Sequence, residues 1–324
     1  MKLAVIGAAG MIGRKLVEGV AATGQLNGQP VTAMTLVDVV APTAPEGFNG
    51  ICDTYAADLT DEGAPARLIA DRPDVIVHLA AIVSGEAEAD MDKGYRVNLD
   101  GTRALLEAIG CINGYCPRVI YASSLAVFGA PFPPKIPDDY HLTPLTSYGT
   151  QKAMGEMLLN DYSRRGMLDG VGIRFPTICI RPGKPNKAAS SFFSSILREP
   201  LNGQEAILPV EDDVRHWFAS PRAAVGYIAH AATMDTGPLA AQRCMTMPGV
   251  SATVGEQIEA LRAVAGDAAV ALIRRAPDPA VASIVAGWPR DFDTTRAISL
   301  GFVAESSFQE IITVYLEDEM GHRP

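Results

Sequence analysis

Short apolar runs that alternate with helical stretches constrain the fold of this chain more than any other feature of its sequence. Each run is near-continuously apolar, which is typical of a strand buried on both faces of a parallel sheet. The five runs are "KLAVIG", "VTAMTLVD", "DVIVHLAA", "PRVIYASS" and "GVGIRFPT". Helices are expected at 11–24, 61–71, 91–110 and 146–165. Strand followed by helix, repeated, predicts an α/β fold with a doubly wound parallel sheet.

The pattern becomes less regular after residue 176. We expect residues 1–176 to form the first domain and residues 177–324 to form mainly a smaller C-terminal lobe. The segment near 214–233 is apolar enough to return to the first domain. Helical patterns in the second part occur at 190–198, 253–265 and 306–317.

Composition narrows the range of partners. The chain is 48% apolar and 20% charged, with a formal net charge of −10. Nucleic-acid binding relies on clustered Lys and Arg, so no nucleic-acid partner is expected. No uninterrupted apolar run reaches the roughly 20 residues of a membrane span, so no membrane partner is expected either.

The N-terminus and the cysteines indicate a cytoplasmic protein. Three glycines break the apolar run of "MKLAVIGAAGMIG", which therefore reads as a strand and a turn rather than as a signal peptide. The five cysteines are an odd number without metal-ligand spacing. We expect buried thiols in a reducing compartment and no metal site.

Polar residues and glycines follow the ends of six expected strands. In an open parallel sheet, ligands bind at the carboxyl ends of the strands, so these residues are expected at one edge. In strand order they are Gly7, Asp38, Asp58, His78, Ser123 with Ser124, and Thr177.

The first of these positions predicts a dinucleotide site. "GAAGMIG" spaces Gly7, Gly10 and Gly13 three residues apart, which allows a tight turn and a close approach to a pyrophosphate at the helix N-terminus. Asp38 is placed to bind ribose hydroxyls and to repel a 2′-phosphate, which favours NAD over NADP. The structural alternatives are tight strand-to-helix packing and a loop-capping aspartate. Asp58 suits an adenine contact or a helix cap equally.

A tyrosine and a lysine suggest the chemistry. Tyr148 and Lys152 lie four residues apart in "LTSYGTQKAMGEMLLNDY", so on a helix they share one face. A phenol has a pKa of about 10, which a nearby ammonium and a positive nicotinamide ring would lower. Ser124, expected to face the same cleft, would hold the substrate oxygen while Tyr148 removes its proton. The alternative is a surface tyrosine, a solvated lysine and a strand-end serine.

Together these motifs resemble the extended short-chain dehydrogenases/reductases, the NAD-dependent epimerase/dehydratase type. The resemblance is carried by the glycine turn, "VHLAA" (77–81), "VNLDGT" (97–102), "SSLAVFG" (123–129) and "YGTQK" (148–152).

The resemblance implies a Rossmann sheet that binds NAD and a smaller C-terminal substrate-binding lobe. It makes Tyr148 the base, Lys152 its activator and ribose ligand, and Ser124 the polarising hydroxyl, with Ser123 as its close alternative. Asn98 would order the helix that backs the site or cap a helix. The residues implied around NAD are Gly7, Gly10, Met11, Ile12, Gly13, Asp38, Asp58, Leu59, Leu79, Ala80, Ala81, Asn98, Tyr148, Lys152 and Pro176.

Departures from the family pattern concern the substrate. Thr177 in "RFPT" stands where nucleotide-sugar enzymes usually carry an Asn. "RHWFA" keeps Arg215 but puts His216 where the family has an Asp. A large nucleotide handle is therefore disfavoured. The stretches "HLAAIVSGEAEADMDKGYRVNLD", "IRPGKPNKAASSFFSSILREPLNG" and "WPRDFDTTRAISLGF" resemble members that oxidise a four-carbon sugar acid at C2.

A small anionic sugar acid needs a cation. A guanidinium matches a carboxylate bidentately, so Arg181 or Arg215 is expected to bind it. Lys184 and Lys187 share the loop of Arg181, and a solvated basic loop explains them equally well.

Two further residues have weaker assignments. Ser84 suits either a substrate hydroxyl or a helix cap. His78 is expected to be a packed strand-end histidine.

The sequence thus predicts NAD-dependent oxidation of the C2 hydroxyl of a short sugar acid, with hydride transfer to NAD. The alternative is a nucleotide-sugar epimerase or dehydratase that recycles bound NAD. A third interpretation is a non-catalytic NAD-binding protein, although such proteins commonly lose the Tyr or the Lys. The resemblance also implies a homodimer through the helices near 91–110 and 146–165, where a monomer remains the alternative.

Overall fold

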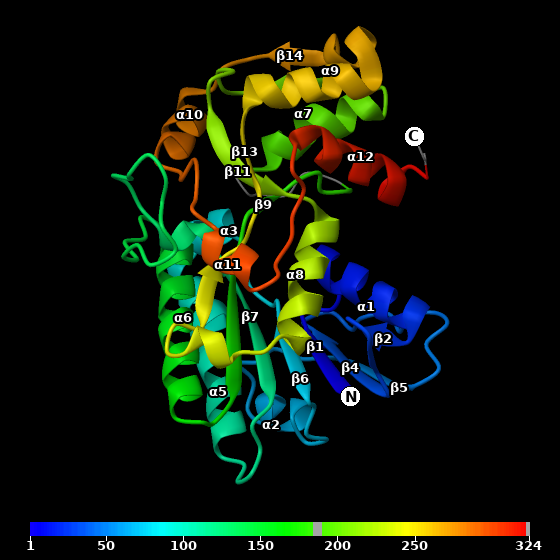
Figure 1. Cartoon of the computed structure of the whole chain (residues 1–324), viewed down its shortest axis with the longest axis vertical. Coiled ribbons are helices and arrows are strands. Elements are labelled where there is room, and N and C mark those ends of the chain that lie inside the picture. The colour runs from blue at the N-terminus through cyan, green and yellow to red at the C-terminus, as the bar shows by residue number, and fades with distance from the viewer. Residues whose placement is uncertain (184–189, 322–324) are drawn as a thin grey trace. The chain divides into compact units, whose positions relative to one another are not determined.

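The computed structural model describes residues 1–183 and 190–321 and contains two compact units (Figure 1). Unit 1 comprises Met1–Val127, Thr146–Arg174 and Val225–Met245. Unit 2 comprises Phe128–Leu145, Phe175–Ala224 and Thr246–Pro324.

Unit 1 is built on a seven-stranded sheet with the order β12-β8-β7-β6-β1-β4-β5. β1 pairs in parallel with β4 and β6, β4 with β5, and β6 with β7. All four residues of β6 are buried, as predicted for a strand covered on both faces. The strands are β1 (Lys2–Ile6), β4 (Ala33–Asp38), β5 (Ile51–Ala56), β6 (Val75–His78), β7 (Arg118–Ser124), β8 (Asp169–Phe175) and β12 (Cys244–Thr246). The predicted doubly wound sheet is confirmed.

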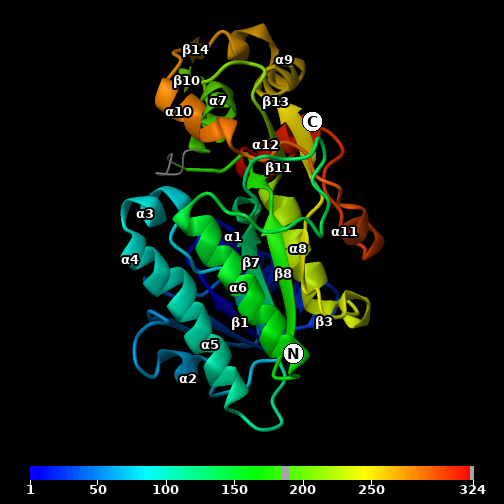
Figure 2. The ribbon, with the colours of Figure 1, turned by 90° about the vertical axis from the view of Figure 1, so that its left-hand side faces the viewer.

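Helices cover both faces of this sheet (Figures 1 and 2). α2 (Ala64–Leu68), α5 (Gly101–Gly110) and α6 (Ser147–Arg164) lie on one face, and α1 (Met11–Thr23) lies on the other. Leu105 of α5 and Leu159 of α6 share a buried apolar cluster with Ala4 and Ile6 of β1. At the end of α8 (Pro221–Thr233), Thr233 accepts a hydrogen bond from Asn27, which follows α1.

Two expected helices differ in detail. The helix expected at 91–110 consists of α4 (Met91–Gly94), a π-helical segment η1 (Tyr95–Asp100) and α5. Such π-helical segments often occur at functional sites. The helix expected at 61–71 is shortened to α2, because Asp58 holds the preceding turn and Gly63 has a φ of 79°.

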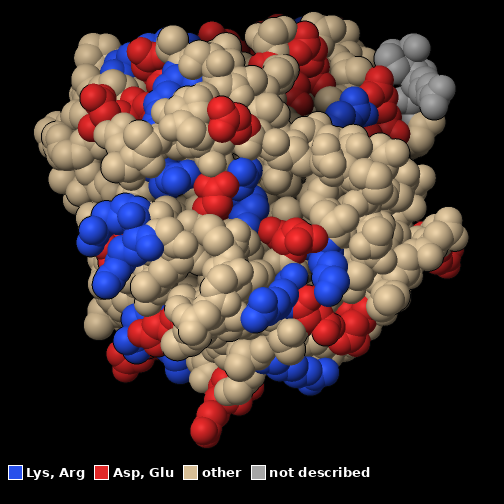
Figure 3. Space-filling model, turned by 60° about the horizontal axis from the view of Figure 1, so that its bottom comes forward, with Lys and Arg blue, Asp and Glu red and all other residues tan. Residues whose placement is uncertain are grey.

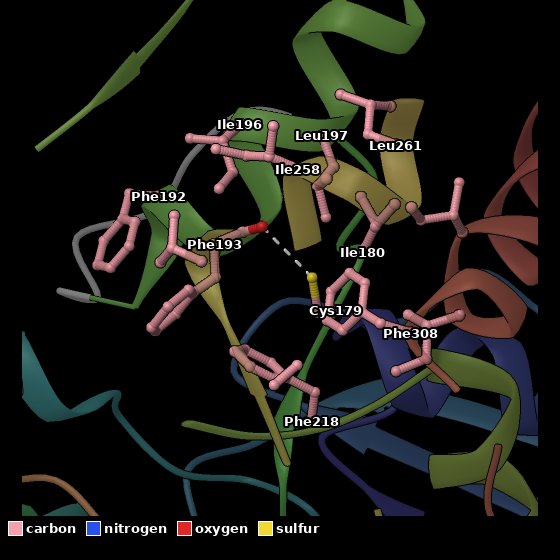
Figure 4. Close-up of a cluster of buried hydrophobic side chains, with 14 of the residues drawn as sticks. Cys179, Ile180, Phe192, Phe193, Ile196, Leu197, Phe218, Ile258, Leu261 and Phe308 are labelled. Carbon is pink, nitrogen blue, oxygen red and sulfur yellow. Dashed lines mark hydrogen bonds between the residues drawn. The ribbon is translucent and has the colours of Figure 1, made fainter. Parts of the chain in front are cut away.

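Unit 2 has a three-stranded sheet of β9 (Thr177–Ile178), β11 (Arg215–Ala219) and β13 (Val250–Thr253). The three helices expected from the sequence are present as α7 (Ser191–Leu201), α9 (Val254–Val270) and α12 (Phe308–Glu319). Figure 4 shows their apolar core, in which Cys179 donates a hydrogen bond to the Phe193 carbonyl at 3.4 Å. The remaining elements are β2 (Gln25–Leu26), β3 (Gln29–Pro30), α3 (Ser84–Ala89), η2 (Leu125–Val127), β10 (Ala206–Leu208), η3 (Gly237–Leu239), β14 (Ile273–Arg275), α10 (Pro279–Ala286) and α11 (Thr295–Ser299).

The division between the units differs from the predicted boundary at residue 176. Phe128–Leu145 belongs to unit 2, because Ile136 forms a β-bridge with Phe292 and the Thr246 amide donates to Asp138 at 2.6 Å. Conversely, Val225–Met245 belongs to unit 1 and supplies most of β12. The first exchange depends on contacts distant in sequence, which local patterns do not reveal. The second agrees in part with the expectation that the segment near 214–233 returns to the first domain.

The expectation of five buried thiols was wrong in part. Cys179 and Cys244 are buried, whereas Cys111 and Cys116 are exposed and Cys52 is half-buried. Burial raises the pKa of the Cys179 thiol to about 12, so this thiol is neutral. No cysteine in the described residues forms a disulfide.

Two surface properties bear on partners. Within the described part of the chain, no helix combines the length and apolarity that crossing a membrane requires. On the face shown in Figure 3, Lys and Arg side chains are interspersed with Asp and Glu. That face therefore carries no continuous basic surface of the kind that nucleic acids bind.

Candidate functional site

The glycine turn after β1 forms a cradle that only glycines fit. Gly7 has a φ of 89°, and a Cβ there would lie 2.7 Å from the Ala80 amide nitrogen. A Cβ on Gly13 would lie 2.2 Å from the Gly7 carbonyl oxygen. The amides of Leu79 and Ala80 both donate to the Ile6 carbonyl, which fixes the end of β6 beside the turn. These contacts show the tight strand-to-helix packing that the sequence left as an alternative, and a dinucleotide-binding glycine turn requires the same packing.

The N-terminus of α1 completes this cradle. Its N-cap, Gly10, makes no side-chain cap, so the first amides of the helix, beginning at Met11 and Ile12, are not satisfied in that way. Such amides favour an anion.

Asp38 lies at the end of β4, beside the glycine turn. Its carboxylate accepts hydrogen bonds from the amides of Ala9 at 3.0 Å and Val39 at 2.7 Å. The loop-capping alternative is therefore present, and it also holds the carboxylate against the glycine turn. This geometry suits the predicted ribose contact, and the cradle and the carboxylate together fit NAD.

Asp58 holds the turn that follows β5. Its carboxylate accepts from the Thr60 amide at 2.9 Å and the Thr60 hydroxyl at 2.8 Å, and Arg96 lies 3.5 Å away. Burial raises the pKa of Asp58, but the Thr60 hydrogen bonds and Arg96 outweigh it and lower the pKa overall. The N-cap of α2 is Gly63, so Asp58 does not cap that helix. The adenine contact of Asp58 stays a prediction. The neighbouring Leu59 is buried, and its contact with NAD also stays a prediction.

Asn98 joins three segments behind the site. From η1, its Nδ2 donates to Gln151 of α6 at 2.8 Å and to the Ile82 carbonyl at 3.2 Å. Its Oδ1 accepts from the Ile82 amide at 2.9 Å. Asn98 therefore orders the loop after Ala81 and the helix that carries Tyr148, whereas the helix-capping alternative is not observed.

Tyr148 and Lys152 lie in the first turns of α6. Thr146 caps this helix by accepting from the Gly149 amide at 3.0 Å. The Lys152 ammonium lies 5.7 Å from the centre of the Tyr148 ring, and it donates to the Ala122 carbonyl of β7 at 2.7 Å. Ser124 ends the same strand, half-buried, and its Oγ accepts from the Ala126 amide at 3.2 Å. The structure thus joins the tyrosine-lysine pair to the strand that carries the serine.

Burial lowers the pKa values of two basic groups in this region. It lowers the pKa of Lys152 to about 7, while the charge of Glu156 acts in the opposite direction. Burial, followed by the charge of Lys152, lowers the pKa of His78 to about 3. Because Thr102 donates to the Asn98 carbonyl, it accepts from His78 Nε2. His78 is therefore the packed, neutral histidine that the sequence predicted.

Ser123 forms a hydrogen bond to a buried ion pair that the sequence analysis did not predict. Its Oγ donates to Glu156 at 2.5 Å, and Arg174 binds both oxygens of the same carboxylate. Strand alternation places Ser123 and Ser124 on opposite faces of β7. The ion pair therefore favours Ser124 over Ser123 as the substrate-polarising hydroxyl. The spacing of Glu156 from Lys152, four residues along one helix, was the available signal.

Ser84 does not cap a helix. It is the first residue of α3, and Val83 occupies the N-cap position. Its contact with a substrate hydroxyl stays a prediction.

Unit 2 carries the predicted residues Pro176 and Thr177. Pro176 is buried next to β9. Thr177 Oγ1 and His216 Nε2 lie 2.7 Å apart, and His216 Nδ1 lies 2.8 Å from the Pro289 carbonyl. A carbonyl only accepts, so Nδ1 carries the proton and Nε2 accepts from Thr177. Burial lowers the pKa of His216 to about 4, so the ring is neutral.

The two candidate arginines have partners within unit 2. Arg181 donates through Nε to the Ile178 carbonyl at 2.9 Å and through Nη2 to Ser190 at 3.3 Å. Arg215 donates to the Ser251 carbonyl at 3.1 Å and pairs with Glu256 at 3.1 Å. Their assignment to a carboxylate stays a prediction. Lys184 and Lys187 lie outside the described residues.

No group of three or more His, Cys, Asp and Glu side chains is arranged to hold a metal ion in residues 1–183 and 190–321.

Comparison with known proteins identifies relatives over the whole chain. Residues 3–236 match the model of the NAD dependent epimerase/dehydratase family. A D-erythronate dehydrogenase of Cupriavidus necator is 45% identical, with 98% of each chain covered. A D-erythronate dehydrogenase of Haemophilus influenzae is 42% identical, with 99% of this chain and 100% of the relative covered.

Solved structures show the same fold. A crystal structure described as a nucleoside-diphosphate-sugar epimerase from Agrobacterium tumefaciens is 61% identical, with a TM-score of 0.98 and coverage of 100% of this chain and 95% of that one. A GalE-like L-threonine dehydrogenase from Cupriavidus necator is 22% identical, with a TM-score of 0.84 and coverage of 98% and 99%. The latter likeness concerns the fold alone.

Proposed function

The chain belongs to the NAD dependent epimerase/dehydratase family, and we propose that it oxidises the C2 hydroxyl of D-erythronate to give 2-dehydro-D-erythronate. The substrate is suggested by two near-full-length relatives named D-erythronate dehydrogenase. The observation that carries the reaction type is the buried Lys152 ammonium, held between the Tyr148 ring and the strand that ends at Ser124.

The residues of unit 1 have separate tasks in this reaction. Gly7, Gly13 and Asp38 would hold NAD, which would supply the hydride acceptor. Tyr148 removes the proton of the substrate hydroxyl, and Ser124 holds the oxygen of that hydroxyl. The Lys152 ammonium favours the phenolate form of Tyr148, which is what makes a phenol an adequate base near neutral pH.

Thr177 supports a hydroxyl-rich substrate. Its hydroxyl proton is donated to the neutral His216, which leaves Thr177 Oγ1 only lone pairs to offer. A sugar hydroxyl can donate to those lone pairs, whereas a carboxylate or phosphate oxygen cannot. We assign the substrate carboxylate to Arg181 or Arg215, and replacing the correct one with Gln raises KM for the acid.

A nucleotide-sugar epimerase is the second candidate, because the relative described as a nucleoside-diphosphate-sugar epimerase is 61% identical. Such an enzyme returns the hydride to its substrate within each turnover, so it accumulates no NADH. Accumulation of NADH therefore separates the two candidates.

The first experiment mixes purified protein with NAD and a panel of four-carbon sugar acids and follows the absorbance of NADH. We expect a rise with D-erythronate, none with L-threonate, and none for Tyr148→Phe. Tyr162→Phe, on the same helix but outside the site, is the matched control and keeps the wild-type rate. An absence of NADH with every acid, together with epimerisation of a nucleotide sugar, would transfer the proposal to the second candidate.

We further propose a homodimer in the cytoplasm. α4 and α6 pack against one another and expose Met91, Met154 and Met157, which supports an interface on these helices. The reduced thiols support the compartment. Light scattering of wild type and Met157→Asp tests the dimer. A monomeric wild type contradicts it.

A further inference from the structure

Glu156 lies in the buried layer next to the catalytic pair and takes no part in the steps above. Its residue is 1% exposed, and it follows Lys152 by one helical turn, so both side chains lie on one face of α6. Isolated buried carboxyl groups tend to take up a proton. At Glu156, three donor groups point at the carboxylate oxygens and stabilise a negative charge there.

These donors come from β7 and β8. Arg174 donates through Nε at 2.9 Å to one oxygen and through Nη2 at 2.8 Å to the other, a bidentate arrangement. Ser123 Oγ donates at 2.5 Å. The position of the negative charge is therefore fixed and is sealed from solvent.

A nearby negative charge would stabilise the buried ammonium of Lys152. It is 2% exposed, and the Ala122 carbonyl is the hydrogen-bond acceptor that the described residues provide for it. The Tyr121 and Tyr148 rings lie 5.0 and 5.7 Å from its ammonium. These contacts only partly replace the water that a buried ammonium has lost.

We propose that Glu156 is a positioning residue whose fixed negative charge keeps Lys152 protonated and so keeps Tyr148 an effective base. The other groups near Lys152 do not supply this charge. Tyr121 on β7 and Tyr148 on α6 contact the Lys152 ammonium with their aromatic rings, and His78 on β6 is neutral. Arg174 on β8 is positive and is already paired with Glu156. The inference rests on the proposed dehydrogenase function.

The test is the pH dependence of kcat/KM for NAD reduction in wild type and in Glu156→Gln. Activity requires deprotonated Tyr148 and protonated Lys152, so it falls at high pH as Lys152 loses its proton. Without the Glu156 charge the pKa of Lys152 drops, and the alkaline limb moves to lower pH by about one unit or more. A purely structural role lowers kcat/KM equally at every pH and leaves the limb in place, which would overturn the proposal.

Two further variants keep the test decisive. Asp161→Asn removes a negative charge from the exposed side of the same helix and leaves the limb unchanged, because solvent screens it. Glu156→Gln removes the carboxylate that pairs with Arg174 and can fail to fold. The double variant Glu156→Gln/Arg174→Met removes both partners, and its limb also moves to lower pH.

A direct titration separates this inference from the proposed function. The ε-carbon resonance of Lys152, assigned by its loss in Lys152→Met, reports the protonation of Lys152 without any substrate. A lower titration midpoint in Glu156→Gln supports the role of Glu156 even if no sugar acid reduces NAD. An unchanged midpoint in an enzyme that does reduce NAD overturns the inference alone.

Discussion

Replacing Lys152 with methionine should stabilise the fold while abolishing activity. The ammonium is fully buried, and burial lowers its pKa from 10.5 to about 7. That drop of about 3.5 pH units means that the folded state disfavours the protonated lysine by about 5 kcal/mol relative to water. A methionine of similar length removes this cost and fills the same space.

The pH dependence follows from the two pKa values. The unfolded chain keeps the Lys152 proton up to pH 10.5, whereas the folded chain releases it near pH 7. Between these values the unfolded state binds more protons, so the unfolding free energy of the wild type rises with pH. The unfolding free energy therefore carries no penalty from Lys152 above pH 10.5, and the penalty builds up as the pH falls to 7. From pH 9 to pH 6 the wild type loses about 2–3 kcal/mol that Lys152→Met keeps.

Near pH 7 the methionine variant should be more stable than the wild type by about 3 kcal/mol. This value allows about 1–2 kcal/mol for the lost hydrogen bond to the Ala122 carbonyl. The assay is urea unfolding without NAD, followed by circular dichroism at several pH values from 6 to 9. Lys135→Met, at an exposed position, is the matched control and shows no such pH-dependent difference. A Lys152→Met variant that is less stable than wild type at pH 6 would refute the reasoning.

Three other predictions concern single positions. Gly13→Ala should abolish NAD binding in a titration, because its Cβ meets the Gly7 carbonyl at 2.2 Å. The control Gly19→Ala has open space around its Cβ, so it should bind NAD normally and raise the free energy of unfolding by about 1 kcal/mol. Asp38→Ser should lower the ratio of NAD to NADP activity at least tenfold by removing a charge that repels the 2′-phosphate; an unchanged ratio contradicts the assignment. Nitrogen NMR at pH 5 should show His78 protonated on Nε2 only and His216 on Nδ1 only, because their pKa values are about 3 and 4; an imidazolium signal from either would contradict their neutral state.

The sequence predicted the sheet because its signals are local. A strand buried on both faces must be apolar at every position, so "VIVH" and its counterparts are recognisable without any partner. The helices expected at 11–24 and 146–165 end within one or two residues of α1 and α6. The unit boundary was predicted less well, since Phe128–Leu145 joins unit 2 through contacts with residues more than a hundred positions away.

The candidate site also contains residues that the sequence could identify and features that it could not. Gly7, Tyr148 and Lys152 were identifiable, because each is constrained by its immediate neighbours in a turn or on one helix face. The π-helical segment at Asn98 was not, since it depends on a loop and on α6 reaching the same amide. The sequence favoured Ser124 and kept Ser123 as a close alternative. Their surroundings differ because Glu156 and Arg174, from two other elements, meet behind Ser123 only.

The buried charges behind the site support activity and lower the free energy of unfolding. A core of this kind is usually most stable when it is apolar, and replacing a buried ion pair with apolar residues is often neutral or favourable. Here Lys152, Glu156 and Arg174 are all nearly inaccessible to water. The arginine fixes the charge of the glutamate, and the glutamate in turn opposes the effect of burial on the lysine. Glu156 thus offsets the cost of burying Lys152, and Arg174 offsets the cost of burying Glu156. Substitutions at these three residues should therefore affect one another. Lys152→Met and Glu156→Gln/Arg174→Met should therefore show non-additive effects on stability when combined.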